Sequence, residues 1–156
     1  MPNMTISHIR AGNMEAQVIS RFLRESAAAY PAEAGNPDLV AWPEKLASHA
    51  DVFGVVRSDG SLSAALFAYL NDTTTHVGYI TFVCSLPECE KGTAYRLHNE
   101  FLLTAGNCGM AKARLEVVKT NAHALSFYKR LGYVVIADHD DRNRWLMEMP
   151  VERAMS

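Results

Sequence analysis

The segment Glu90-Lys91-Gly92-Thr93-Ala94 places small residues where a strand-like stretch gives way to a helix-like one. Small residues let backbone N–H groups come close to a ligand, and the N-terminus of a helix favours anions. A diphosphate is therefore a natural ligand for this segment. Because the pattern is neither a Walker A loop nor GxGxxG, it also fits a loop whose glycine only starts a helix.

A second segment, Leu115 to Tyr133, reads LEVVKTNAHALSFYKRLGY and carries three side chains that could do chemistry. Glu116 is a carboxylate inside a predicted strand, on the opposite side from its apolar neighbours Leu115 and Val117, and such a carboxylate needs a reason. Asn121 stands where the next helix begins, so its side chain can cap free N–H groups. Tyr128 continues the helical stripe of Phe127, so it is either a core aromatic residue or a phenol placed for proton transfer.

The second segment resembles the late motif of the GCN5-related N-acetyltransferases, L-E-V-x-x-x-N-x-x-A-x-x-F/L-Y-x-x-x-G-F/Y. The matching positions are Leu115, Glu116, Val117, Asn121, Ala124, Phe127, Tyr128, Gly132 and Tyr133. The first segment then resembles the coenzyme A loop of that family, Q/R-x-x-G-x-G/A, at Gly92 and Ala94, whereas Cys89 replaces the long polar residue. The strand order agrees over nearly the whole chain, but the first 50 residues match only in outline.

The resemblance implies that acetyl-CoA is the co-substrate and that no metal takes part. Pantetheine would enter between two splayed parallel strands, and the pyrophosphate would sit on N–H groups at the start of the helix. One such N–H could also stabilise the oxyanion that develops on the thioester. The coenzyme-binding residues expected on this basis are Phe82, Val83, Cys84, Cys89, Glu90, Lys91, Gly92, Thr93, Ala94, Asn121 and Tyr128.

The resemblance also implies two catalytic roles. Tyr128 would be the general acid that protonates the thiolate leaving group, and Glu116, or a water, would be the general base that deprotonates the amine. For Glu116 a structural role stays open, in which it bonds a neighbouring strand or pairs with an arginine. Two departures bear on coenzyme affinity: Cys89 replaces the polar residue, and Glu90 brings negative charge that Lys91 and Arg96 could offset.

The elements that position these residues follow from hydrophobic period and from turn residues. The predicted strands are Thr5–Arg10, Val52–Val56, Leu62–Leu70, Val77–Cys84, Ala113–Lys119, Tyr133–Ile136 and Arg144–Met149. Helices are predicted after an N-cap at Asn13, over Leu39–Ala47, from Gly92 to Cys108 with Cys108 on its apolar face, and from Asn121 to Leu131. This order predicts a mixed sheet with helices on its faces and a parallel crossover from Val77 to Lys119. The resemblance implies the finer description, an α/β fold with a single mixed, mostly antiparallel sheet, a splayed parallel central pair and flanking helices, as in the acyl-CoA N-acyltransferase fold.

Length and charge set limits on the class of protein. The chain has 156 residues and a net charge of −2, which predicts one domain over residues 1–156 and argues against a uniformly basic nucleic-acid binder. No stretch has the length of a membrane span or a signal peptide, and the three cysteines form no CxxC, so we expect free thiols in a reducing cytoplasm. The acidic segment from Asp138 to Asp141, with His139 inside it, is predicted to be a solvated turn.

The residues that bind the acceptor amine can be suggested only from their place in the predicted fold. Tyr30, Trp42 and Tyr79 fall on the helices and strand ends that would face the coenzyme, so they are the candidate acceptor-binding residues. A small-molecule amine and a peptide or protein amine both remain open, and the resemblance also allows a homodimer. The rival hypothesis is a non-catalytic acyl-CoA-binding or regulatory module of the same fold, which the altered position of Cys89 would support.

Overall fold

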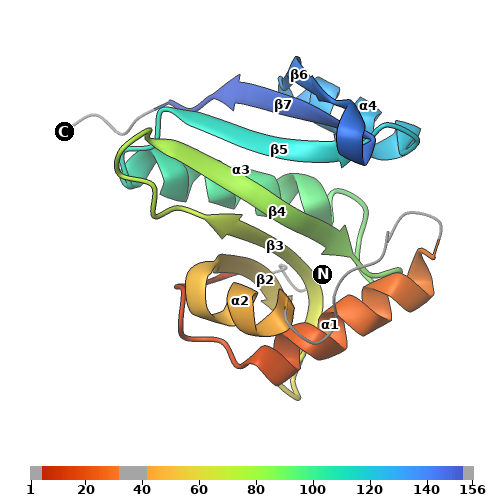
Figure 1. The fold of residues 1–156 in the computed structure, drawn as a ribbon. Helices are drawn as coiled ribbons and strands as arrows, with labels where there is room; N and C mark the ends of the chain where they lie inside the picture. The colour runs from red at the N-terminus through yellow and green to blue at the C-terminus, as the bar shows by residue number, and fades with distance from the viewer. Residues whose placement is uncertain (1–4, 32–41, 153–156) are drawn as a thin grey trace. The chain divides into compact units, whose positions relative to one another are not determined.

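A computed structural model describes residues 5–31 and 42–152 (Figure 1). The strands are β1 (Ser7–Ile9), β2 (Asp51–Val56), β3 (Leu62–Tyr69), β4 (Val77–Ser85), β5 (Lys112–Val118), β6 (Val134–His139) and β7 (Arg144–Pro150). The helices are α1 (Ala16–Ala29), α2 (Trp42–His49), α3 (Thr93–Asn107) and α4 (Ala122–Leu131), with a short 3₁₀ helix, η1, at Asp140–Arg142.

The strands form one seven-stranded sheet in the order β1-β2-β3-β4-β5-β7-β6. β4 and β5 pair in parallel, while β1 with β2, β2 with β3, β5 with β7 and β6 with β7 pair antiparallel. The predicted fold class, a mixed α/β sheet with one parallel pair and flanking helices, is confirmed. The parallel pair is possible because α3 carries the chain from β4 to β5, which a tight turn cannot do.

The contacts of the chain gather in two compact units. The first comprises Met1–Tyr69 and Phe82–Phe101, and the second comprises Leu70–Thr81 and Leu102–Ser156, so β4 and α3 contribute to both. In the first unit, α1 presents Ile19, Phe22 and Leu23 on one side, as helical spacing requires, and all three are buried. They pack into a core with Leu46 of α2 and with buried residues of β2 and β3.

The second unit is arranged around β5. Its ladder with β7 runs from Lys112 opposite Pro150 to Val118 opposite Arg144. Along β5, burial alternates so that Ala113, Leu115 and Val117 are buried while the residues between them are less so. Because successive side chains of a strand point to opposite faces, Glu116 lies on the face opposite to Leu115 and Val117.

Two expectations about helix ends need correction, and one prediction lies outside the described residues. Asn13 is not the N-cap of α1: the helix begins after Glu15, and Asn13 instead closes a turn by donating its N–H to the carbonyl of Arg10 at 3.0 Å. Cys108 is exposed, because α3 ends at Asn107 before reaching it. The predicted helical residues 39–41 lie outside the described residues.

The last strand pair also differs from the prediction. β6 runs on to His139, so the turn is the 3₁₀ helix η1 rather than the whole acidic segment. The reason is pairing with β7, which reaches Asp138 opposite Trp145 and His139 opposite Arg144. β6 lies at the end of the strand order, its register shifts between Val135 and Ala137, and it exposes three apolar side chains: Val134, Val135 and Ile136.

Candidate active site

The loop before α3 has the backbone that the small-residue pattern predicts. Gly92 has φ +88°, in the left-handed region where glycine is favoured, and no heavy atom lies within 4 Å of the position a Cβ would take. Thr93 then starts the helix and donates its hydroxyl to the carbonyl of Glu90 at 2.6 Å. A 15-residue helix that begins here directs its free N–H groups and the positive end of its dipole at this loop, which suits a phosphate.

The loop is held to β3 at its other end, and Cys89 is one of the contacts. Its thiol donates to the carbonyl of Ser63 at 3.2 Å, and the N–H of Leu86 donates to the same carbonyl at 2.9 Å. Between them lies Glu88, whose carboxylate receives two hydrogen bonds from the guanidinium of Arg57. Cys89 therefore orders the loop by a thiol contact in place of a long polar side chain.

The C-terminal part of β4 carries the predicted pantetheine contacts, and two of the predicted acceptor residues, Tyr30 after α1 and Trp42 in α2, contact it. The ring of Phe82 packs 5.7 Å from the ring of Trp42, edge on, and 6.3 Å from that of Phe22. The hydroxyl of Tyr30 donates to the carbonyl of Ser85 at 2.8 Å. Tyr30 and Trp42 are thus brought to β4, next to the expected coenzyme segment.

The third predicted acceptor residue, Tyr79, lies in the second unit beside Glu116. Its hydroxyl donates to Oε1 of Glu116 at 3.1 Å. The other carboxylate oxygen, Oε2, is 2.7 Å from Nδ1 of His139 and 2.8 Å from Nε of Arg142. We call Tyr79, Glu116, His139 and Arg142 the Glu116 cluster.

Burial and hydrogen bonding act in opposite directions on Glu116. Burial alone raises the pKa of this carboxyl, since the side chain is only 16% exposed, but the hydrogen bonds from His139, Arg142 and Tyr79 lower it further than burial raises it. The net result is a pKa below the ordinary value of a glutamate. For Tyr79, burial and then the adjacent negative charge of Glu116 raise the pKa, so its phenol stays protonated and remains a donor.

The ladder between β4 and β5 ends next to this cluster. It runs from Val77 opposite Lys112 to Ile80 opposite Leu115. Both strands continue past this last pair, β4 to Ser85 and β5 to Val118. Glu116 is thus the first residue of β5 beyond the ladder.

Tyr128 lies in α4, and the two ends of this helix are defined by Asn121 and Gly132. Oδ1 of Asn121 accepts the N–H of Ala124 at 3.0 Å, which confirms the predicted cap, and Gly132 ends the helix with φ +113°. The Tyr128 ring packs 5.6 Å from the ring of Tyr133. Burial raises the pKa of Tyr128, so the phenol is protonated at neutral pH.

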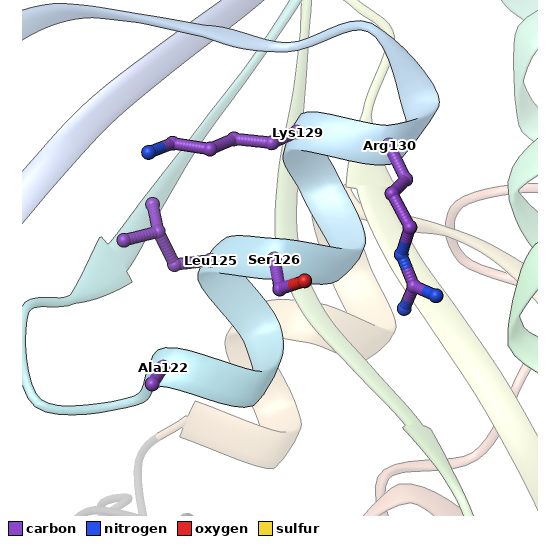
Figure 2. A pocket seen from close by; sticks show the side chains of 5 residues that line it. All are labelled: Ala122, Leu125, Ser126, Lys129 and Arg130. Carbon is purple, nitrogen blue, oxygen red and sulfur yellow. The ribbon is translucent and has the colours of Figure 1, made fainter.

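A shallow depression of about 380 Å³ lies along α4, and Figure 2 shows the side chains that line it. It is lined by Ala122, Leu125, Ser126, Lys129 and Arg130, and none of these is a predicted site residue. Lys129 and Arg130 are exposed and extend from the last turn of the helix, where cations are favoured by the helix dipole.

The sequence missed His139 and Arg142. Both follow acidic residues in a segment whose composition is typical of a turn, and only the pairing of β6 with β7 brings them to Glu116. Within residues 5–31 and 42–152, no three His, Cys, Asp or Glu side chains are grouped as metal ligands would be. Among the same residues, no helix is both long and apolar enough to cross a membrane.

Comparison with solved structures shows the same fold in many acetyltransferases. The PaiA N-acetyltransferase of Thermoplasma acidophilum, solved with coenzyme A, has a TM-score of 0.69 at 18% identity over 94% of this chain and 99% of that one. The ribosomal-protein-S18-alanine N-acetyltransferase of Escherichia coli has a TM-score of 0.67 at 17% identity over 97% and 96%. A GNAT-family protein of Desulfovibrio desulfuricans, described as a putative acetyltransferase, has a TM-score of 0.73 at 14% identity over 94% and 99%.

A search of curated proteins gave no match. At these identities the solved structures establish the fold alone. The model of the acetyltransferase (GNAT) family, in contrast, matches residues 19–133, which is most of the chain and includes both segments singled out in the sequence. The chain therefore belongs to the acetyltransferase (GNAT) family.

Proposed function

We propose that this protein, as a single domain over residues 1–156, is an acetyl-CoA-dependent N-acetyltransferase that acetylates a primary amine by direct attack on the thioester. The observation that carries the proposal is the Glu116 carboxylate, which lies on the first residue of β5 beyond the β4–β5 ladder and is shielded from solvent. A carboxylate in a sheet of apolar residues is costly unless it is paired, and here it has three donors. Family membership supports acetyl transfer in general.

In this proposal, coenzyme A binds residues of β4 and the loop before α3. Main-chain groups of Phe82, Val83 and Cys84 lie past the ladder with β5 and would bond pantetheine in the manner of an added strand. The pyrophosphate would bind N–H groups of the segment from Cys89 to Ala94. The open space beside Gly92 and the contacts that hold Cys89 support this assignment, because they leave room for a ligand against an ordered loop. Asn121 and Tyr128 complete the proposed set.

The proposed chemistry separates two proton transfers. Glu116, directly or through a water, removes a proton from the acceptor ammonium, and the free amine attacks the thioester carbon. The C–S bond then breaks, and Tyr128 gives its proton to the thiolate. The surplus proton of the attacking nitrogen then reprotonates Tyr128. The raised pKa of Tyr128 supports this role, since an acid must be protonated before it can donate.

The acceptor is proposed to bind near the end of β4, where Tyr30 and Trp42 contact Ser85 and Phe82. A small-molecule amine and a peptide amine both fit this proposal. The E. coli structural neighbour is named for an alanine of a ribosomal protein, which is a reason to include peptides with free N-termini among the first acceptors tested.

The test is calorimetric titration with acetyl-CoA, followed by thiol release in the same sample against a mixed panel of amines and peptides. We expect binding, and thiol release with one class of acceptor. Binding without thiol release over a broad panel would favour the rival hypothesis of an acyl-CoA-binding module. Failure to bind coenzyme A would contradict the proposal.

A further inference from the structure

The arrangement of the Glu116 cluster raises the question of where the proton from the acceptor goes. Both oxygens of Glu116 are engaged: Oε1 accepts from Tyr79, and Oε2 is shared by His139 and Arg142. A carboxylate that already accepts three hydrogen bonds is a poor proton acceptor. The imidazole of His139 is the less buried of the pair, at 28% exposed against 16% for Glu116.

We propose that His139 is the general base of the acetyl transfer and that Glu116 is the positioning residue that holds its ring. This inference rests on the proposed function and refines it, because the proton of the acceptor ammonium passes to His139 rather than to the carboxylate. An imidazole suits the task, since it is the side chain that most readily changes charge near neutral pH. A carboxylate bonded to one ring nitrogen orients the ring and stabilises its charged form.

The contact at Nδ1 decides which nitrogen is the base. Nδ1 lies 2.7 Å from Oε2 of Glu116, and two lone pairs at that distance would repel, so the proton belongs on Nδ1. Nε2 is then the unprotonated nitrogen that can accept a proton from the amine. Nη2 of Arg142, which can only donate, also lies 2.8 Å from Nδ1 and competes for the same nitrogen. The proposed role of His139 requires that the contact with Glu116 prevails, since Arg142 is half exposed and already donates through Nε to Oε2.

The charges around His139 come from four elements. Glu116 on β5 is negative, while Arg142 on η1 and the cross-strand partner Arg144 on β7 are positive. On the same strand and turn, Asp138 and Asp140 are negative, but both are paired with Lys119. Tyr79 on β4 stays neutral beside Glu116. His139 thus has one carboxylate in direct contact and two arginines nearby.

The proton balance of the step is complete. The acceptor R–NH₃⁺ gives one proton to Nε2 of His139, which becomes imidazolium and later releases that proton to solvent. The amine nitrogen then forms the N–C bond, the C–S bond breaks, and the thiolate takes the proton of Tyr128. The second proton of the attacking nitrogen passes to the Tyr128 oxygen and restores the phenol. The net reaction consumes acetyl-CoA and R–NH₃⁺ and yields the acetamide, coenzyme A and one proton.

The first arm of the test uses His139→Asn in the full-length protein. Asparagine can keep an N–H donor toward Glu116 but cannot accept the proton, so it separates positioning from base catalysis. We expect kcat/KM for the acceptor to fall about 100-fold or more, with the acidic limb of its pH profile abolished and acetyl-CoA affinity unchanged. The matched control is His8→Asn, since His8 bonds Asp51 at the same 2.7 Å in another part of the chain, and its activity should equal wild type. Wild-type activity and pH profile in His139→Asn would overturn the inference.

The second arm is a spectroscopic measurement that does not depend on enzymatic activity and uses no variant of His139. Nitrogen-15 NMR of the wild-type imidazoles should show neutral His139 as the Nδ1–H tautomer, and Glu116→Gln should reduce the population of that tautomer. A neutral ring protonated on Nε2 would overturn the inference even if the enzyme is active. Wild-type protein that binds coenzyme A but acetylates nothing would instead overturn the proposed function.

Discussion

At the scale of single residues, the candidate site separates groups that keep a proton from groups that give one up. Burial keeps Tyr128 and Tyr79 protonated, whereas hydrogen bonds keep Glu116 ionised despite its burial. This separation leaves Tyr128 able to donate a proton and Glu116 able to hold its hydrogen-bond donors, His139 among them, by its negative charge. The residue types were readable from the sequence, but their states depend on neighbours that only the fold supplies.

Tyr128→Phe removes one hydroxyl while leaving the aromatic ring to pack against Tyr133. We expect kcat to fall about 100-fold, because a general acid contributes a factor of that order, with acetyl-CoA affinity unchanged. Tyr69→Phe, in which the hydroxyl lost belongs to β3, is the control and should keep full activity. Stopped-flow thiol release with calorimetry would check this, and an unchanged chemical step in Tyr128→Phe would remove it from the acid role.

At the scale of elements, several predictions held because they rest on local chemistry. Asn121 caps α4 and Gly132 ends it, and the helical spacing of Leu97, Phe101 and Ala105 marks the buried side of α3. The end of β6 was predicted wrongly because the strand is exposed along most of its length and shows no alternation of apolar residues. Its extent is set by pairing with β7, a contact that no short window of sequence contains, so the part played by His139 and Arg142 could not be predicted. The expectation that Glu116 could bond a neighbouring strand or pair with an arginine is met by Tyr79 and Arg142.

The loop before α3 depends on a glycine backbone. Gly92→Ala should cost about 1 kcal/mol of stability, because φ +88° is strained for alanine while the space for a Cβ is open. Gly60 shares both features, with φ +88° and no atom within 4 Å, but lies in the turn between β2 and β3. We therefore expect equal losses of stability from Gly92→Ala and Gly60→Ala by chemical denaturation, and weaker coenzyme binding only from the first. Equal coenzyme affinity in the two variants would argue that this loop does not contact the coenzyme.

The thiol of Cys89 offers a second test of the same loop. Cys89→Ala removes the hydrogen bond to the Ser63 carbonyl, so we expect the KM for acetyl-CoA to rise several-fold while kcat changes little. Cys89→Ser, which keeps a donor, should recover part of the loss. Cys108→Ala, at an exposed cysteine beyond α3, is the control and should match wild type in steady-state kinetics. Identical KM values in all three variants would show that the thiol contact is dispensable.

At the scale of the whole molecule, ion pairs join segments that are distant in sequence. Arg57, beside the turn between β2 and β3, bonds Glu25 of α1 and Glu88 of the loop before α3. Hydrogen bonds from Arg57 are the largest influence on both carboxyl groups and lower the pKa of each. Elsewhere the Ser61 hydroxyl and N–H hold the pKa of Asp59 at about 2.

These shifts fix the sign of the acid response. A carboxyl whose pKa is lower in the folded state stabilises the fold above the unfolded value near 4.3, and the contribution is lost as the pH falls through the folded value. We expect the melting temperature to decline below about pH 4.3, and Arg57→Met to be less stable at pH 7 with a shallower decline. Arg24→Met removes an arginine that bonds only a backbone carbonyl and should follow wild type. Differential scanning calorimetry between pH 7 and pH 2.5 would check this, and parallel curves for wild type and Arg57→Met would contradict it.

The outer strand of the sheet has a consequence for self-association. β6 ends the strand order and exposes Val134, Val135 and Ile136, and an exposed apolar edge strand favours pairing with other chains. The register shift between Val135 and Ala137 breaks the even spacing of main-chain groups that a further strand would need. The register shift in β6 thus disfavours the addition of strands from other copies of the chain, and restoring an even register by deleting Ile136 would be expected to promote amyloid-like assembly.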